Sequence, residues 1–138
     1  MAISPKVWHH EKEQQELPVS QSHADLMRHV AETDSTFILR GRFWAGRCLI
    51  CGGPLCFEER TGDGATLEHI LPRSLGGTND LRNLGIAHMR CNNEKGRHWD
   101  PRRRHQAQQD RYVAMLQRLL AERECRWREE SADRERAL

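Results

Sequence analysis

One group of residues in the middle of the chain has the spacing of metal ligands. Cys48 and Cys51 form a Cys-x-x-Cys pair followed by two glycines, which tolerate the turn that brings two thiolates together. His88 and Cys91 are three residues apart, so on a helix they share one face. Three cysteines and one histidine suit a tetrahedral Zn²⁺ with no open position. The sequence therefore predicts a structural zinc site.

A second group has the residue types that phosphodiester hydrolysis needs. Asn92 directly follows the last predicted zinc ligand, so on a helix it points about 100° away from the zinc, with Lys95 beside it. Glu68 and His69 come from the chain before this helix. A neutral imidazole can deprotonate water, a carboxylate and an amide oxygen can hold Mg²⁺ or Mn²⁺, and a lysine can contact phosphate. Asn93 would compete for the ligand role of Asn92 if the helix register differs by one residue.

Short elements are expected to position both groups. The segments 54–59 and 65–70 are predicted as strands, and the Asp63-Gly64 step between them predicts that they pair as a hairpin. Residues 87–97 have the pattern of a short helix. This helix would carry zinc ligands on one side and the catalytic group on the other.

The adjacent Glu68 and His69 set a condition on this interpretation. Side chains alternate along a strand, so these two would point to opposite faces. A bulge or a strand end before Pro72 is needed for both to serve one site.

The order of these elements resembles the HNH endonuclease family over residues 48–96. The quoted elements are Cys-x-x-Cys, Glu-His-Ile-x-Pro, Gly-Gly, Asn-Leu and His-x-x-Cys-Asn-x-x-Lys-Gly. The resemblance implies a ββα-metal fold that grips one divalent ion and hydrolyses DNA to a 5′-phosphate and a 3′-hydroxyl. It implies that His69 is the general base, that Glu68 and Asn92 bind the ion, and that Asn83 is the loop asparagine that supports the histidine.

Three positions differ from the commonest pattern of that family. Glu68 stands where aspartate is frequent, and its longer side chain could bind the ion differently or through water. His88 stands where a cysteine is usual, which zinc accepts. Asn92 replaces a histidine, which favours Mg²⁺ or Mn²⁺ over a transition metal.

The basic charge of the chain lies mainly toward its C-terminal end. The net charge is +2, but residues 97–138 carry eleven basic and eight acidic side chains. The densest cluster, Arg102, Arg103 and Arg104, follows the predicted site and suggests, with Lys95, a phosphate partner. A solvated helix face is the alternative for much of this segment.

Length and composition predict one small α+β domain with helical extensions. A chain of 138 residues that is 37% hydrophobic has room for a small core only. We divide it into an N-terminal extension with one short helix over 1–40, the nuclease domain over 41–100 and a charged helical arm over 101–138. The apolar stripe of the arm would pack on the domain or on a second chain.

The N-terminal helix has its own signals. Ser22 is a candidate N-cap, with Asp25 three residues on. An apolar face formed by Leu26, Met27, Val30 and Ala31 indicates a helix to about residue 32.

The expected partner is DNA, most simply double-stranded. The sequence has no signal segment and no apolar run that could span a membrane, so we expect a soluble cytoplasmic protein with reduced thiols. Two alternatives remain open: a zinc-stapled nucleic-acid-binding module without catalysis, and a subunit of a larger phage or restriction machine. The C-terminal helix could also mediate a homodimer.

Overall fold

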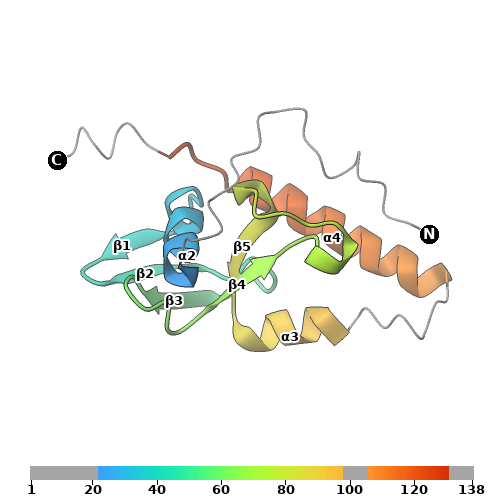
Figure 1. The fold of residues 1–138 in the computed structure, drawn as a ribbon, viewed down its shortest axis with the longest axis horizontal. Helices are drawn as coiled ribbons and strands as arrows, with labels where there is room; N and C mark the ends of the chain where they lie inside the picture. The colour runs from blue at the N-terminus through green and yellow to red at the C-terminus, as the bar shows by residue number, and fades with distance from the viewer. Residues whose placement is uncertain (1–21, 98–105, 131–138) are drawn as a thin grey trace.

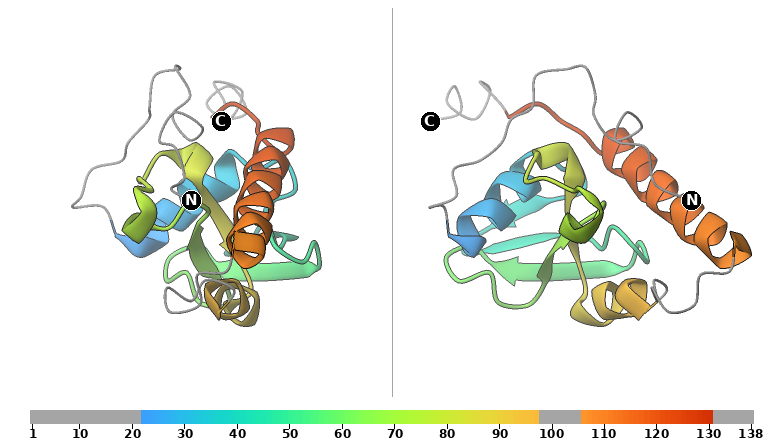
Figure 2. Two further views of the ribbon diagram at one scale, coloured as in Figure 1. Left: turned by 90° about the vertical axis from the view of Figure 1, so that its right-hand side faces the viewer. Right: turned by 45° about the vertical axis from the view of Figure 1, so that its right-hand side comes forward.

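The computed structural model describes residues 22–97 and 106–130, and these form an α+β fold with three helices and two small sheets (Figure 1). The predicted fold class is confirmed. In the view of Figure 1, α4 runs diagonally past the upper right side of the β4–β5 pair and α3 lies below the pair, and α3 stays at the bottom in the turned views of Figure 2. Among the described helices, none is long and apolar enough to cross a membrane.

The first described helix, α2 (His23–Glu32), begins as its sequence predicts. The Ser22 side chain accepts a hydrogen bond of 3.1 Å from the backbone N–H of Asp25, which satisfies one of the donors that a helix start leaves open. The predicted apolar face is buried: Leu26, Met27, Val30 and Ala31. They join the main hydrophobic core with Phe37, Trp44 and Phe57.

The first sheet contains three antiparallel strands, β1 (Ile38–Arg40), β2 (Phe43–Arg47) and β3 (Pro54–Glu58). A two-residue turn joins β1 to β2, and Gly41 supplies its positive φ of 61°. The turn between β2 and β3 contains the Cys-x-x-Cys pair. The sheet thus delivers two predicted zinc ligands at one end.

The predicted hairpin between the strands around Asp63-Gly64 is wrong. β3 pairs with β2, whereas β4 (Thr66–His69) pairs antiparallel with β5 (Leu84–Ala87), a strand that the sequence analysis did not predict. Both segments are strands, but the turn between them connects two different sheets. A local turn signal reports the chain reversal and leaves the pairing partner open.

Two helices complete the described structure. α3 (Met89–Arg97) matches the predicted short helix, and α4 (Gln106–Cys125) lies along the domain. Short 3₁₀ turns, η1 (Arg73–Leu75) and η2 (Leu81–Asn83), shape the loop between β4 and β5. The predicted helix start at Asp100-Pro101 lies outside the described residues.

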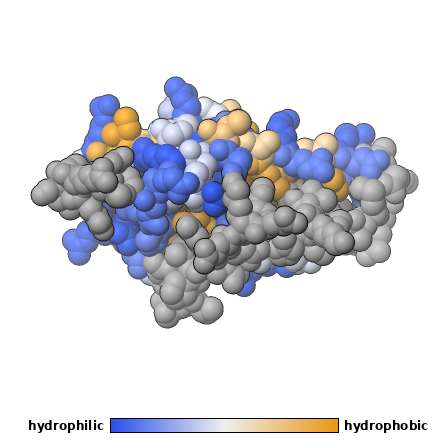
Figure 3. Space-filling model, turned by 90° about the horizontal axis from the view of Figure 1, so that it is seen from above, coloured by the Kyte–Doolittle hydropathy of each residue, from blue (hydrophilic) through white to orange (hydrophobic). Residues whose placement is uncertain are grey.

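The described part of the C-terminal segment packs on the rest of the fold rather than projecting from it. Tyr112, Leu116 and Leu119 of α4 are buried, in clusters with Ile70 and Leu71. The core therefore draws residues from all three predicted segments of the chain. Elsewhere, polar residues cover most of the described surface in the view of Figure 3, with hydrophobic residues in smaller patches.

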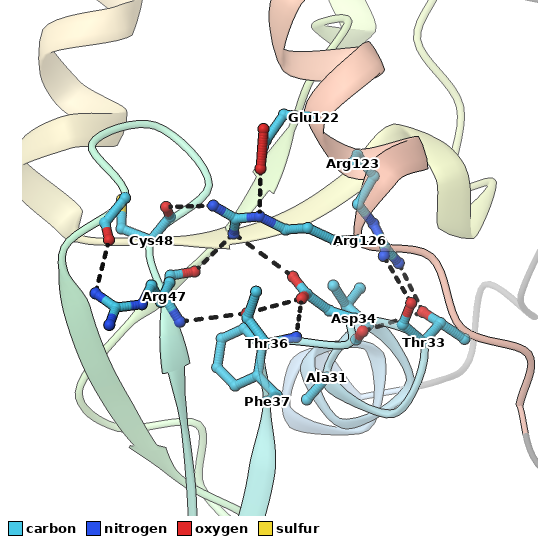
Figure 4. A network of polar contacts seen from close by, with 12 residues as sticks. Ala31, Thr33, Asp34, Thr36, Phe37, Arg47, Cys48, Glu122, Arg123 and Arg126 are labelled. Carbon is cyan, nitrogen blue, oxygen red and sulfur yellow. Dashed lines mark hydrogen bonds and ion pairs between the residues drawn. The ribbon is translucent and has the colours of Figure 1, made fainter.

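Buried arginines hold the end of α4 against the first sheet and α2 (Figure 4). Arg123 is fully buried and donates to the carbonyl oxygens of Thr33, Leu84 and Leu81 at 2.7–3.2 Å. Arg126 donates to the carbonyl oxygens of Arg47 and Cys48 at 3.0 and 3.3 Å. Since buried carbonyl groups are costly to leave unpaired, these bonds fix α4 to the turn that carries the cysteines.

Candidate functional site

The four predicted zinc ligands come together. The ligand atoms of Cys48, Cys51, His88 and Cys91 all lie within 4.8 Å of one another. His88 Nδ1 is 3.4 Å from Cys51 Sγ and 3.7 Å from Cys91 Sγ. Tetrahedral Zn²⁺ with bonds of about 2.3 Å to sulfur and about 2.1 Å to nitrogen places such atoms about 3.6 Å apart. The cluster can therefore hold a structural metal such as zinc.

The groups around the cluster orient its ligands. His88 Nε2 lies 3.0 Å from the carbonyl oxygen of Pro54, so Nε2–H donates there and Nδ1 is left as the ligand atom. The backbone N–H of Gly53 donates to Cys51 Sγ at 3.3 Å, and that of His88 lies 3.5 Å from Cys48 Sγ. Such N–H donors stabilise thiolate, the form that binds metal.

Without a metal ion, the thiols of Cys51 and Cys91 have different pKa values. The backbone hydrogen bond from Gly53 lowers the pKa of Cys51 to about 7. Burial, together with the neighbouring Cys51 and Cys48, raises the pKa of Cys91 to about 11. Three packed thiols cannot all become thiolates without a compensating cation, so this donor set favours a divalent ion of soft or borderline character.

Glu68 faces α3 and pairs with Lys95. Their side chains are 2% and 5% exposed, and the ammonium contacts the carboxylate and donates to the carbonyl oxygen of His69 at 3.1 Å. Burial raises the pKa of Glu68 above its ordinary value, whereas the Lys95 charge lowers it. From the sequence, Lys95 is predicted to contact phosphate. In the structure its ammonium neutralises a buried carboxylate instead.

We expect this buried pair to couple strongly in a double-mutant cycle. Lys95→Met leaves the Glu68 carboxylate buried without its cation, and breaking a buried pair in this way costs about 3–5 kcal/mol. The double variant Glu68→Gln/Lys95→Met should lose clearly less than the sum of the two single losses, because no unpaired charge remains. Urea denaturation at pH 7 measures the free energy of unfolding of each of the three variants relative to wild type. Additive losses would show that the two side chains do not interact.

His69 is the last residue of β4, and both Glu68 and His69 lie inside this strand without a bulge, so the break in alternation that a shared site required does not occur between them. Pairing is regular up to that point, so Glu68 turns toward α3 and His69 turns away from it. His69 Nε2 lies 2.8 Å from Asn79 Oδ1. With Nε2–H donating to this oxygen, the other ring nitrogen, Nδ1, is free to accept a proton.

The surroundings of His69 keep its imidazole neutral. Burial lowers its pKa, the hydrogen bond to Asn79 raises it, and the nearby charges of Arg73, His23 and Lys95 lower it further. The net direction is below the ordinary value, so the ring is a neutral base at pH 7. Arg73, His23 and Asn79 were not among the predicted site residues.

The 71–83 loop is held by Asn83 and shaped by two glycines. The Asn83 amide accepts from Leu71 N–H at 2.8 Å and donates to Leu71 O at 3.1 Å and to Thr78 O at 2.9 Å. Asn83 therefore acts on the loop backbone, and Asn79 contacts the His69 ring. A Cβ at Gly77 would lie 1.7 Å from Leu71 O, so the loop closes only with glycine there.

Asn92 lies across from the strand that carries Glu68. Its Nδ2 is 3.4 Å from Thr66 Oγ1, and Thr66 shares a face of β4 with Glu68. A carboxylate and an amide oxygen on facing elements are donors that suit a hard divalent ion. The predicted nucleic-acid contacts Arg102, Arg103 and Arg104 lie outside the described residues.

The missed residues carried weak sequence signals. Arg73 and Asn79 lie in the Gly-rich loop, where polar residues are ordinary turn formers. His23 belongs to α2, which precedes His69 by more than forty positions. Only the packing of α2 beside β4 brings it near.

The fold and the clusters define this part of the molecule as a small α+β domain with a Cys₃His group that could hold a metal ion. A model of the HNH endonuclease family matches residues 48–108, which confirms the resemblance seen in the sequence over that part of the chain. The match starts at the first predicted zinc ligand and includes every predicted site residue. No curated protein and no solved structure matches the chain.

Proposed function

We propose that this protein is an endonuclease that hydrolyses DNA phosphodiester bonds with a divalent ion, while a structural zinc holds the domain together. The observation that carries the proposal is the position of His69. It ends β4 with one ring nitrogen bound to Asn79, a lowered pKa and two cationic side chains nearby. The match to the HNH endonuclease family supports the same class of reaction.

In this proposal His69 Nδ1 takes a proton from water, and the hydroxide attacks phosphorus. The bond between phosphorus and the 3′ oxygen breaks, and this oxygen takes a proton from solvent water, which leaves a 5′-phosphate and a 3′-hydroxyl. Asn79 holds the ring through Nε2, and the guanidinium of Arg73 places a positive charge near the ring, where it would attract a phosphate. Glu68 and Asn92 would hold Mg²⁺ or Mn²⁺, which stabilises negative charge on the leaving oxygen.

A non-catalytic nucleic-acid-binding module is the second candidate, and one observation favours it. The Glu68 carboxylate is already neutralised by Lys95 within a buried pair. A divalent ion must compete with that ammonium or be bound beside it. A binder would use the zinc-held scaffold and the basic side chains and need no second ion.

Cleavage assays separate these functions. Supercoiled and linear DNA are incubated with the protein plus Mg²⁺, Mn²⁺ or a chelator. The proposal predicts product with Mg²⁺ or Mn²⁺ and none when divalent ions are removed, and the supercoiled substrate distinguishes nicking from double-strand cutting. Salt-sensitive DNA binding without cleavage under any of these conditions would favour the binding module.

The titration of His69 gives a more direct prediction. In the protein with zinc in the Cys₃His cluster and no added Mg²⁺ or Mn²⁺, its imidazole should titrate below its ordinary pKa, and Arg73→Gln should move the midpoint upward. The sign follows because removing a positive neighbour makes the protonated, positively charged ring less unfavourable. NMR of the His69 ring over a pH series measures both midpoints.

Arg60→Gln is the matched control. Arg60 is exposed and is not among the groups that shift the pKa of His69, so this variant should titrate like wild type. An unchanged midpoint in Arg73→Gln would remove Arg73 from the site.

A further inference from the structure

A pocket of about 450 Å³ opens between the start of α2, the turn before β4 and the start of α3. Its lining residues are His23, Met27, Thr61, Gly62, Asp63, Gly64, Ala65 and Met89. The volume falls in the range of small-ligand sites, roughly 300–1,000 Å³. None of the predicted site residues lines it.

The pocket continues the row of groups that form the proposed catalytic site. Along α3 and β4, Lys95 contacts Glu68, and Asn92 approaches Thr66. One helical turn before Asn92 lies Met89, which lines the pocket with Ala65. The distance along the helix from Met89 to Asn92 is about 4.5 Å. The pocket therefore adjoins the proposed ion site.

His23 links the pocket to the general base. It lines the pocket, and its charge is among those that act on His69. The scissile phosphate of a bound strand would thus lie beside His69, with the neighbouring nucleotide at the pocket.

The lining has the chemistry that a nucleobase requires. Met89 is 65% exposed, a high fraction for a large apolar side chain, so its sulfur is open to a ligand in the pocket. Methionine sulfur makes favourable contacts with aromatic rings. Within the described residues, the exposed Asp63 carboxylate has no hydrogen-bond or ion-pair partner. It could accept a hydrogen bond from the exocyclic amine of cytosine or adenine.

We propose that this pocket receives the unpaired base of a nucleotide next to the scissile phosphate. The inference rests on the proposed nuclease function and names its substrate class: DNA in which a base near the cut is single-stranded or leaves the stack. Enclosing a base in a pocket requires the base to leave the stack, and this costs least free energy when the base is already unpaired. The protein should therefore cut such DNA faster than a fully paired duplex of the same sequence.

Base replacement tests the pocket. Cleavage positions are first mapped with wild-type protein and Mg²⁺ on single-stranded and partly paired oligonucleotides. Each nucleotide around the cut is then replaced in turn by an abasic residue, and the binding of each oligonucleotide is measured with the His69→Ala variant. We expect an abasic residue at one position next to the cut to weaken binding by about tenfold, which is the effect of losing one stacked base.

Met89→Glu, added to the same background, should bind the intact and the abasic oligonucleotide alike. Ile38→Glu is the matched control: Ile38 is 55% exposed on the first sheet, so the same change of an exposed apolar residue should keep the tenfold difference. The pocket proposal would be rejected if abasic residues at all positions changed binding equally, or if Met89→Glu still bound the intact oligonucleotide more tightly than the abasic one. The nuclease proposal would stand in either case. Absence of cleavage of every DNA by the wild-type protein would overturn both.

Discussion

Replacing His69 by alanine is expected to lower the rate of DNA cleavage by about 10²–10⁴-fold, the usual contribution of a general base. The ring is held through Nε2 by Asn79, and its pKa is lowered by burial and by nearby cations. No other described side chain combines a free basic nitrogen with this position at the end of β4. Single-turnover cleavage with saturating Mg²⁺ measures the loss.

The same variant should keep the fold, because the His69 side chain is only partly buried and lies outside the hydrophobic clusters. Metal content and circular dichroism should match wild type. Asn79→Ala should produce a smaller loss, since it frees the orientation of the ring and leaves the base in place. Cleavage by His69→Ala at the wild-type rate would remove His69 from the reaction.

Removing the metal from the Cys₃His cluster is expected to unfold the domain. Structural zinc contributes about 10–16 kcal/mol of apparent binding free energy at pH 7, whereas a whole domain is stable by about 5–15 kcal/mol. The cluster joins the turn after β2 to the start of α3. Without the ion the packed thiols and the imidazole lose the group that holds these two elements together.

One zinc per chain should be found by metal analysis of the purified protein, and Cys91→Ser should lose both the metal and cooperative thermal unfolding. Zinc binding at neutral pH should release protons, because the cysteine thiols are mostly protonated without metal and bind zinc as thiolates. Calorimetry in buffers of different ionisation enthalpy measures that release.

Cys56 and Cys125 provide the matched controls. Both are exposed and lie outside the cluster. Cys56→Ser and Cys125→Ser should retain the metal and stay within about 0.5 kcal/mol of wild type, as surface substitutions usually do. Equal stability of Cys91→Ser and Cys56→Ser would show that the cluster does not staple the fold.

Features set by short-range spacing were predictable. Ser22 and Asp25 define the start of α2, and the apolar face of that helix follows from its period. His88 and Cys91 share a helix face whatever the rest of the chain does. Their meeting with Cys48 and Cys51 followed from the ligand chemistry of zinc, which leaves few other partners for these residue types.

Strand pairing was not predictable from local signals. Asp63-Gly64 indicated a reversal of the chain, and a reversal exists, but β3 pairs with β2 and β4 pairs with β5. The turn that carries Cys48 and Cys51 joins β2 to β3, so these two strands pair with each other, and the Asp63-Gly64 turn plays no part in that pairing. The partner of β4 comes from residues 84–87, beyond a loop whose closure depends on the packing of Asn83 and Gly77.

The sequence by itself determined the ligand chemistry, the resemblance of residues 48–108 to the HNH endonuclease family and the candidates Glu68, His69 and Asn92, because residue type and near spacing decide these. Only the tertiary structure decided which charges meet. It buried Lys95 against Glu68, and it brought His23 from α2 and Arg73 and Asn79 from the loop toward His69. The physical reason is that burial and electrostatic neighbours depend on the packing of segments far apart in the chain, which no local pattern encodes.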